Sequence, residues 1–222
     1  MNLSEAARVN NQQLSQLRKL VSQGEGLRLE FKKKASHPEK IVRELIAFAN
    51  TEGGVLLIGV DDDKTISGVK YPEEEILAVK QALEKFCRPV ILLVETIIPI
   101  SENRFVVELV VSLGERRPYF FKLSPEEKES YIRASDKSIK ASKEMIEIVR
   151  RSKSKKDIRF TFGEPEKQLM EYLEVNGKIT IAEFRKAAKL NRFIAAKKLI
   201  LLVLANVLRI TPTEKGDLYS RI

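Results

Sequence analysis

The sequence predicts an α+β protein with two domains, a mixed-sheet domain followed by a small winged helix-turn-helix domain. Over residues 1–149, segments with period-two alternation follow segments with helical spacing of apolar residues, which is typical of an α+β domain. Residues 150–159, RRSKSKKDIR, carry six Lys or Arg against one Asp, as expected of a solvated linker. The remaining order of helix, helix, helix and hairpin predicts a winged helix-turn-helix. We therefore expect four parts: an N-terminal helix over 1–21, an α+β domain over 22–149, a basic linker over 150–162 and a winged helix-turn-helix domain over 163–222.

The elements of the first domain follow from local patterns. Residues 1–24 have amphipathic helical spacing and predict a helix that docks on the main domain or on a second subunit. Residues 27–33, LRLEFKK, alternate strictly, which predicts a strand with one buried face. A helix over 38–49 leads through two glycines to the strand 55–60, which has no polar residue at alternate positions and should be central. The rest of the domain should contain a hairpin partner over 64–70, a helix over 73–86, long strands over 91–100 and 104–113, two shorter strands and a closing helix over 143–150.

The predicted second domain carries clear helix signals. Thr180 with Glu183 three residues later forms a capping-box pattern, and Asn191 can cap the third helix. That helix would enter the major groove of DNA, while the hairpin touches the backbone. Its apolar run Leu199–Leu204 exceeds what a small domain should bury, so we expect part of it to form a homodimer contact.

Composition limits the class of protein. Hydrophobic residues make up 43% of the chain, and no apolar run approaches the roughly 20 residues that a membrane span needs. The N-terminal sequence lacks a secretory pattern, so we expect a cytoplasmic protein without a membrane partner. One Cys and one His exclude a disulfide scaffold and a zinc site built mainly from these residues. The formal charge of +9 predicts a polyanionic partner, with nucleic acid first.

The stretch AFANTEGGVLLIGVDDD, residues 47–63, admits several interpretations. Gly54 and Gly59 have the separation of P-loop glycines, but no Lys-Ser pair follows and the glycines do not come after the strand, so we expect no ATP site of this kind. The three aspartates could be a hairpin turn. Alternatively, with Glu25 and Glu30 they could bind Mg²⁺ or Mn²⁺, although Glu30 could simply pair with its strand neighbours.

Four segments together resemble the Schlafen AlbA-type domain: LEFK (29–32), residues 47–63, Arg117-Pro118-Tyr119 and YIRASDKS (131–138). The resemblance covers roughly residues 20–145. It implies DNA binding and transcriptional control, with a C-terminal winged helix in bacterial relatives and no required cofactor. It also implies an alternative, a metal-dependent endoribonuclease, in which Glu25, Glu30 and Asp61 or Asp62 would be catalytic and Glu25, Glu30 and Asp62 would hold Mg²⁺ or Mn²⁺. The nucleolytic relatives use a duplicated domain, so this chain would have to dimerise.

We prefer the interpretation as a DNA-binding transcriptional regulator, with DNA favoured over RNA. A scaffold that binds other proteins through both domains is a further alternative. Basic side chains would supply phosphate contacts, which give affinity without sequence information. The residues predicted to contact nucleic acid are Lys32, Lys33, Arg117, Arg133 and Lys137 in the first domain, and Asn191, Arg192, Lys197, Lys198 and Lys215 in the second.

Overall fold

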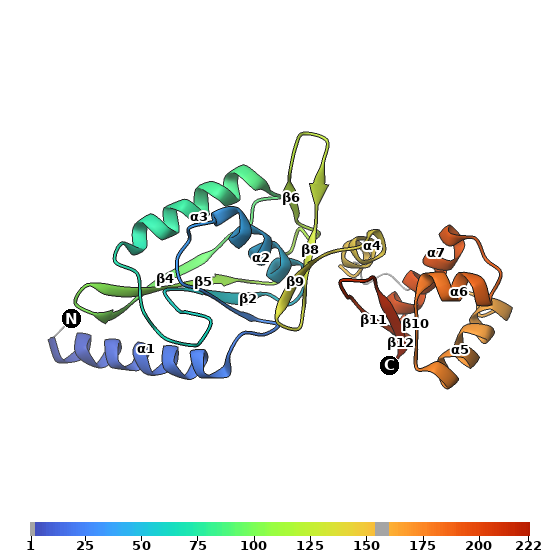
Figure 1. The fold of residues 1–222 in the computed structure, drawn as a ribbon, viewed down its shortest axis with the longest axis horizontal. Coiled ribbons are helices and arrows are strands. Elements are labelled where there is room, and N and C mark those ends of the chain that lie inside the picture. Colours follow the sequence, from blue (N-terminus) through green and yellow to red (C-terminus); the bar gives the residue numbers. More distant parts are fainter. Residues whose placement is uncertain (1–2, 154–159) are drawn as a thin grey trace. The chain divides into compact units, whose positions relative to one another are not determined.

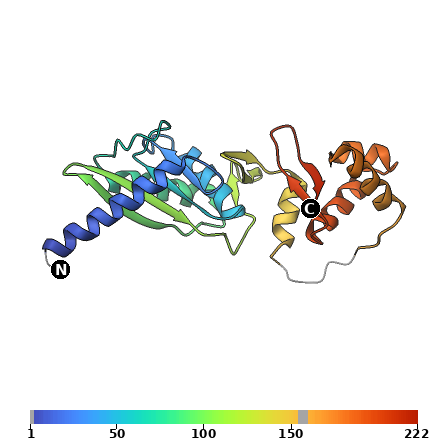
Figure 2. The same ribbon diagram turned by 90° about the horizontal axis from the view of Figure 1, so that it is seen from below.

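The computed structural model describes residues 3–153 and 160–222 and divides the chain into two compact units, Met1–Ser138 and Ile139–Ile222 (Figures 1 and 2). Part of the predicted basic linker, residues 154–159, lies outside the described residues, as do residues 1–2 of the predicted N-terminal helix. The boundary between the units falls before the closing helix that we assigned to the first domain. The predicted domain boundaries stay a prediction. No helix of the described ranges combines the length and apolar character that a bilayer span requires.

The first unit alternates helices and strands. Its elements are α1 (Leu3–Gln23), β1 (Leu29–Lys32), α2 (Pro38–Asn50), β2 (Gly54–Ile58), α3 (Pro72–Phe86), β3 (Cys87–Arg88), β4 (Val94–Ser101), β5 (Arg104–Val111), β6 (Phe120–Lys122), β7 (Lys128–Glu129) and β8 (Tyr131–Ala134), and β9 (Lys137–Lys140) crosses the boundary between the units. Seven helices and mixed sheets in the described chain confirm the predicted α+β class.

A four-stranded sheet organises the first unit, in the order β1-β2-β5-β4. Strands β1 and β2 are parallel and joined by α2, whereas β5 runs antiparallel to both β2 and β4. Strand β2 is therefore internal, as its apolar sequence predicted. Helices α2 and α3 cover one face of the sheet, and α1 covers the other (Figure 1). The α1 side is sealed by Leu17 and Val21, which pack with Phe31 of β1 and Leu57 of β2.

The end of α2 is tied to the later strands by one buried amide. Asn50, with 4% of its surface exposed, donates from Nδ2 to the carbonyl oxygens of Tyr119, at 3.1 Å, and Tyr131, at 3.0 Å. Its Oδ1 accepts from the backbone N–H of Tyr119 at 2.7 Å. Because both ends of the amide are satisfied inside the protein, Asn50 can be buried without the cost of an unpaired polar group.

Two predicted strands of the first unit differ from the structure. The strand expected over 91–100 begins only at Val94, because residues 89–93 carry no strand pairing and Leu92 is 89% exposed. The hairpin partner expected over 64–70 is reduced to single bridges, Val60 with Ile66 and Val69 with Phe105. The predicted turn itself is present, since the backbone N–H of Asp61 donates to the carbonyl of Thr65 at 2.9 Å. Positive φ angles at Lys64, 71°, and Gly68, 65°, interrupt regular pairing between these points.

The second unit contains α4 (Lys143–Arg151), α5 (Glu164–Asn176), β10 (Lys178–Ile179), α6 (Ile181–Ala187), α7 (Arg192–Leu204), β11 (Leu208–Thr211) and β12 (Leu218–Arg221). Its sheet has the order β10-β12-β11, with antiparallel pairing throughout. The predicted capping box is formed, because Thr180 Oγ1 accepts from the N–H of Glu183 at 3.2 Å while Glu183 Oε2 accepts from the N–H of Thr180 at 2.8 Å. The assignment of residues 163–222 as a winged helix-turn-helix stays a prediction.

The apolar run of α7 is mostly used inside the second unit. Leu199 and Leu202 lie in the core with Leu169, Phe184 and Tyr219. The excess of apolar surface that led us to expect a dimer contact is therefore smaller than predicted, because Leu199 and Leu202 are buried in the core and Ile200, on an adjacent flank of α7, is buried beside α4. Homodimerisation stays a prediction.

Candidate nucleic-acid interface

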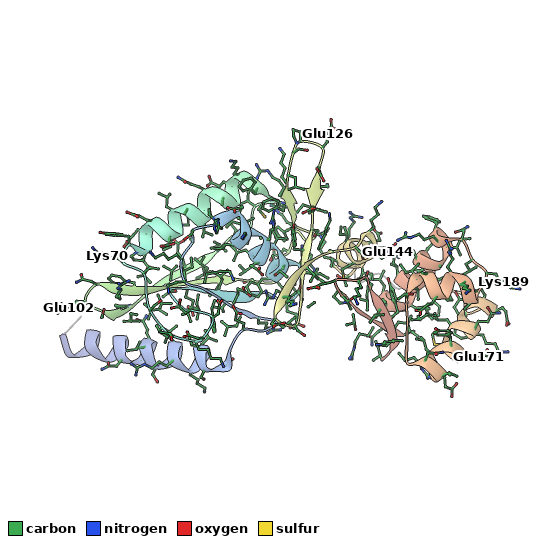
Figure 3. The ribbon with its side chains drawn as sticks, viewed as in Figure 1. Lys70, Glu102, Glu126, Glu144, Glu171 and Lys189 are labelled. Carbon is green, nitrogen blue, oxygen red and sulfur yellow. The ribbon has the colours of Figure 1, made fainter. Side chains whose placement is uncertain are left out.

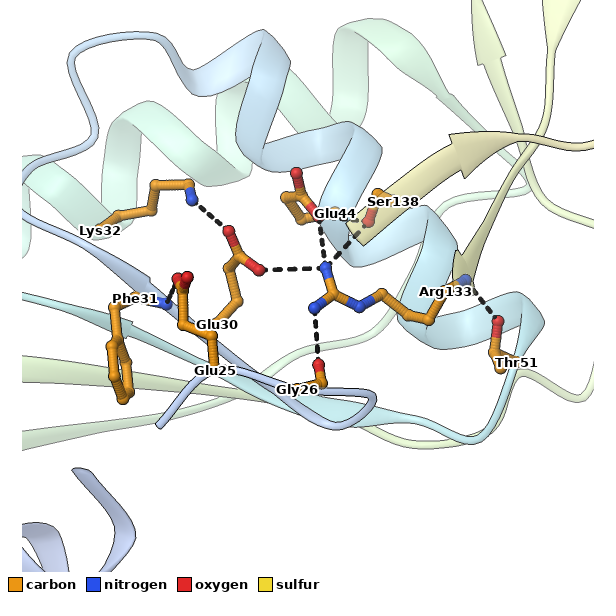
Figure 4. Close-up of polar contacts among 9 residues, drawn as sticks. All are labelled: Glu25, Gly26, Glu30, Phe31, Lys32, Glu44, Thr51, Arg133 and Ser138. Carbon is orange, nitrogen blue, oxygen red and sulfur yellow. Dashed lines mark hydrogen bonds and ion pairs between the residues drawn. The ribbon is translucent and has the colours of Figure 1, made fainter. Parts of the chain in front are cut away.

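The carboxylates predicted for a metal site are already engaged by protein donors. Glu25 Oε1 accepts from the backbone N–H of Phe31 at 2.8 Å. Glu30, on β1, is only 6% exposed; its Oε1 pairs with Lys32 and its Oε2 lies 3.0 Å from Arg133 (Figure 4). Strand alternation places Glu30 and Lys32 on the same face of β1, the face opposite Phe31, which explains their pairing.

Arg133 is the centre of this arrangement. Its side chain comes from β8, has no exposed surface and reaches Glu30 at 3.0 Å and Glu44 of α2 at 2.8 Å. A further guanidinium nitrogen donates to the carbonyl of Gly26 at 2.6 Å (Figure 4). The guanidinium also lies 4.9 Å from the ring centre of Phe48. We had predicted that Arg133 contacts nucleic acid. The structure corrects this prediction, because an enclosed guanidinium with two carboxylate partners cannot reach a phosphate.

Burial changes the protonation equilibrium of Glu44. The pKa of Glu44 is raised, first by burial and then by the neighbouring charge of Glu30, and the hydrogen bond from Ser138 and the charge of Arg133 oppose this rise. Two carboxylates that share one arginine in a low-polarity setting repel each other, so the cluster depends on Arg133 remaining in place.

The predicted metal site does not fit the residues present. Glu25 and Glu30 are occupied as described, and Asp61 pairs with Lys33 at 2.9 Å, which lowers the pKa of Asp61 chiefly through this hydrogen bond. Asp62 is exposed in the turn after β2. Nowhere in residues 3–153 and 160–222 do three His, Cys, Asp or Glu side chains come together as a metal would require. The predicted set of Glu25, Glu30 and Asp62 is therefore not assembled.

The other predicted basic residues of the first unit are spread over several elements. Lys32 is half-buried against Glu30, while the side chain of Lys33 is 69% exposed and reaches Asp61. Arg117 is half-buried and donates to the carbonyl of Gly114 at 3.1 Å. Lys137 is exposed at the start of β9. Of this set, Lys33 and Lys137 keep the largest access to a polyanion.

The predicted residues of the second unit cluster on α7 and on the β11–β12 connection. Asn191 caps α7, since its Oδ1 accepts from the N–H of Ile194 at 2.8 Å, so this oxygen is occupied. Arg192 pairs with Glu144 of α4 at 3.0 Å, and Lys198 pairs with the buried Glu166. Lys197 and Lys215 are exposed, the first on α7 and the second in the turn before β12.

Two residues at this surface escaped the sequence analysis. Glu144 is 6% exposed and faces Arg192, and Phe193 is 76% exposed beside it. The pairing of Glu144 has no local signal, because its partner lies on another helix far along the chain. Phe193 could have been noticed as an aromatic residue among the basic residues of the third predicted helix, a combination that favours nucleic-acid contact.

Comparison with known proteins identifies a family, and several solved structures are similar to this chain. A family model described as Schlafen, AlbA_2 matches residues 25–142, which is more than half of the 222-residue chain. A crystal structure of the DIP2311 protein from Corynebacterium diphtheriae is similar at 16% identity and a TM-score of 0.45, over 94% of this chain. The matched region spans 38% of the length of that protein. A search of curated proteins returns no match.

Proposed function

This chain belongs to the Schlafen AlbA_2 family, and we propose that it is a DNA-binding transcriptional regulator whose second unit makes the DNA contact. Family membership supports nucleic-acid binding by the first unit in general terms. The proposal adds three finer points: DNA is preferred over RNA, residues 163–222 act as a winged helix-turn-helix, and the biological role is control of transcription.

One observation carries the proposal. In the second unit, α7 exposes Lys197, and the turn before β12 exposes Lys215. A helix and an adjacent hairpin that both present cations match the way in which a winged helix-turn-helix holds the major groove and the flanking backbone. Phe193, exposed on the same helix, adds an apolar contact that suits a base edge or a thymine methyl group.

The nuclease alternative receives less support. A hydrolytic metal needs open carboxylate oxygens, whereas Glu30 has both of its oxygens in ion pairs, with Lys32 and Arg133. The same arrangement gives the carboxylates a structural task, namely to hold β1, α2 and β8 together around one arginine. We therefore propose binding without cleavage as the function.

The proposal can be tested by measuring affinity as a function of salt. Fluorescence anisotropy with duplex DNA and with structured RNA would compare the parent with Lys197→Gln, Lys215→Gln and the double variant. Each lost phosphate contact should lower the steepness of log Kd against log salt by about 0.9. Lys167→Gln is the matched control, because it removes one exposed charge from α5 of the same unit.

Three results would contradict the proposal. Equal effects of the Lys197, Lys215 and Lys167 substitutions would show that only net charge matters. Tighter binding of RNA than of DNA would overturn the DNA preference. Cleavage of RNA in Mn²⁺ by the parent, but not by Glu25→Gln, would establish the nuclease alternative instead.

A further inference from the structure

Helix α4 covers one flank of α7, the helix that we propose to contact DNA. Ala195, Leu199 and Leu202 of α7 point into the core of their own unit. Ala196 and Ile200, four residues apart on the adjacent flank, are 7% and 8% exposed without belonging to that core. Residues separated by four positions share one face of a helix, and Arg192 lies on this same flank.

The cover over this flank is provided by α4. A hollow of about 600 Å³ lies where the two helices meet; Glu144 and Glu147 line it from α4, and Arg192, Ala196 and Ile200 line it from α7. The buried carboxylate of Glu144, labelled in Figure 3, lies 3.0 Å from the guanidinium of Arg192. Arg192, one of the cations predicted for DNA, therefore has a buried acid as its ion-pair partner, although its own side chain is 62% exposed.

The start of α4 is also fastened to the hairpin. Ser142 caps α4 by accepting from the N–H of Met145 at 2.9 Å, and its Oγ donates to the carboxylate of Asp217. Asp217 lies two residues after Lys215, at the entry to β12, and burial raises its pKa. Helix α4 therefore contacts both α7 and the β11–β12 hairpin, the two elements that a winged helix-turn-helix would apply to DNA.

We infer that α4 is an autoinhibitory segment, which covers the flank of α7 that carries Ala196 and Ile200, pairs Glu144 with Arg192, and must move away before this flank can lie against duplex DNA. The inference rests on the proposed function of the second unit. The carboxylate of Glu144 takes the place of a DNA phosphate at Arg192, and the bond between Ser142 and Asp217 holds the segment on the hairpin. DNA and α4 compete for the same surface, so the affinity of the full chain is lower than that of the uncovered surface.

The experiment is a double-mutant cycle on the full chain, measured with one duplex DNA at one salt concentration. Glu144→Gln keeps the shape of the side chain and removes the charge that faces Arg192. Glu147→Gln is the matched control, because Glu147 lies on the same helix, lines the same hollow and pairs with Arg150 of α4 itself. Both substitutions change the net charge equally. Arg192→Gln is then measured in the parent and in the Glu144→Gln background.

Glu144→Gln should tighten DNA binding about fivefold, which corresponds to about 1 kcal/mol, whereas Glu147→Gln should change it by less than about twofold. Arg192→Gln should weaken binding more in the Glu144→Gln background than in the parent, because only there does no carboxylate compete with DNA phosphate for Arg192. Equal gains from both glutamate substitutions, or an identical loss from Arg192→Gln in both backgrounds, would overturn the inference.

Hydrogen exchange on the parent protein supplies an independent measurement. If α4 leaves on binding, amides within residues 146–151 should lose protection when duplex DNA is added. Unchanged or increased protection would overturn the inference even if the glutamate variants bind more tightly. Failure of the proposed function itself is seen separately, as a lack of any specific effect of Lys197→Gln and Lys215→Gln.

Discussion

Replacement of Arg133 by Met should destabilise the first unit strongly. Met keeps most of the length and apolar stem of the side chain but removes the charge that joins Glu30 and Glu44. Both carboxylates would stay buried together without their shared cation. Removing one partner of a buried ion pair typically costs 3–5 kcal/mol; because Glu44 keeps 20% side-chain exposure, we expect about 3 kcal/mol.

Arg28→Met is the matched control, because it also removes one arginine charge from an ion pair. Arg28 pairs with Glu52 at 2.7 Å, but the two side chains are 66% and 45% exposed. Water and mobile ions screen such a pair, so the control should lose less than about 1 kcal/mol. A third variant, with Glu30→Gln and Glu44→Gln added to Arg133→Met, should recover part of the loss, since no buried charge then lacks a partner.

The assay uses the single cysteine as a reporter of the first unit. Cys87 has no exposed surface, so a brief pulse of thiol reagent at increasing urea labels only molecules in which this unit has opened. The labelling midpoint and slope give the free energy of unfolding.

The effect of pH on the Arg133 variant has a definite sign. Burial already raises the pKa of Glu44, and loss of Arg133, which lowers it, should raise it further. A carboxyl group whose folded-state pKa lies above its unfolded-state value destabilises the protein as the pH rises above the unfolded-state value, and the full cost is reached above the folded-state value. The deficit of Arg133→Met should therefore shrink as the pH falls from neutral through the raised folded-state pKa of Glu44. A loss no greater than that of Arg28→Met, or one that grows on acidification, would refute the reasoning.

Three further predictions concern single side chains. Cys87 has no exposed surface and burial raises the pKa of its thiol to about 12, so at pH 8 its alkylation in the native protein should be at least about a thousandfold slower than after unfolding in urea. Thr180→Ala should lower the unfolding free energy of the second unit by about 1 kcal/mol in urea titrations followed by circular dichroism, and Thr180→Ser should not. Lys198→Met should cost about 2 kcal/mol at neutral pH by leaving the buried Glu166 unpaired. Burial by itself would raise the pKa of Glu166, but the hydrogen bond from Lys198 outweighs it and the pKa is lower than usual. The stabilisation that Lys198 gives to ionised Glu166 is therefore present above the unfolded-state pKa. The free-energy cost of Lys198→Met should fade as the pH drops through the folded-state pKa of Glu166.

Local sequence patterns predicted those elements whose burial or capping depends on neighbouring residues alone. The uninterrupted apolar run of β2 predicted an internal strand, and Thr180 with Glu183 predicted a helix start with its cap. Strand β1 shows the limit. Its alternation predicted one buried face, yet Glu30 on the other face is also buried, because Arg133, 103 residues later, neutralises it there. Period two distinguishes the faces of a strand, but it cannot reveal that a distant cation will cover the polar one.

Only some residues of the candidate interface were predicted correctly as exposed, because distant ion-pair partners cannot be seen in local sequence. Lys197 and Lys215 are exposed, as their positions on a helix and a turn suggested. Arg133 and Arg192 carry the same charge in the sequence, but in the structure they face Glu44 and Glu144, respectively. Whether an arginine is available to a ligand depends on which acid the fold brings to it. That pairing is a property of tertiary structure and leaves no mark within a few residues of either partner.

The hydrogen bonds of the buried Asn50 make the first unit sensitive to deamidation of this one side chain. Aspartate has the same outline as asparagine, but it would turn the donor that faces the carbonyls of Tyr119 and Tyr131 into a second acceptor. Deamidation at this position would therefore convert attractive contacts into repulsive ones without any change in volume. The reaction needs the N–H of Thr51 to turn toward the side chain, and that N–H is held by the carbonyl of Phe48 at 3.1 Å. The last turn of α2 thus protects the Asn50 amide from deamidation while the hydrogen bond between Thr51 and Phe48 is intact.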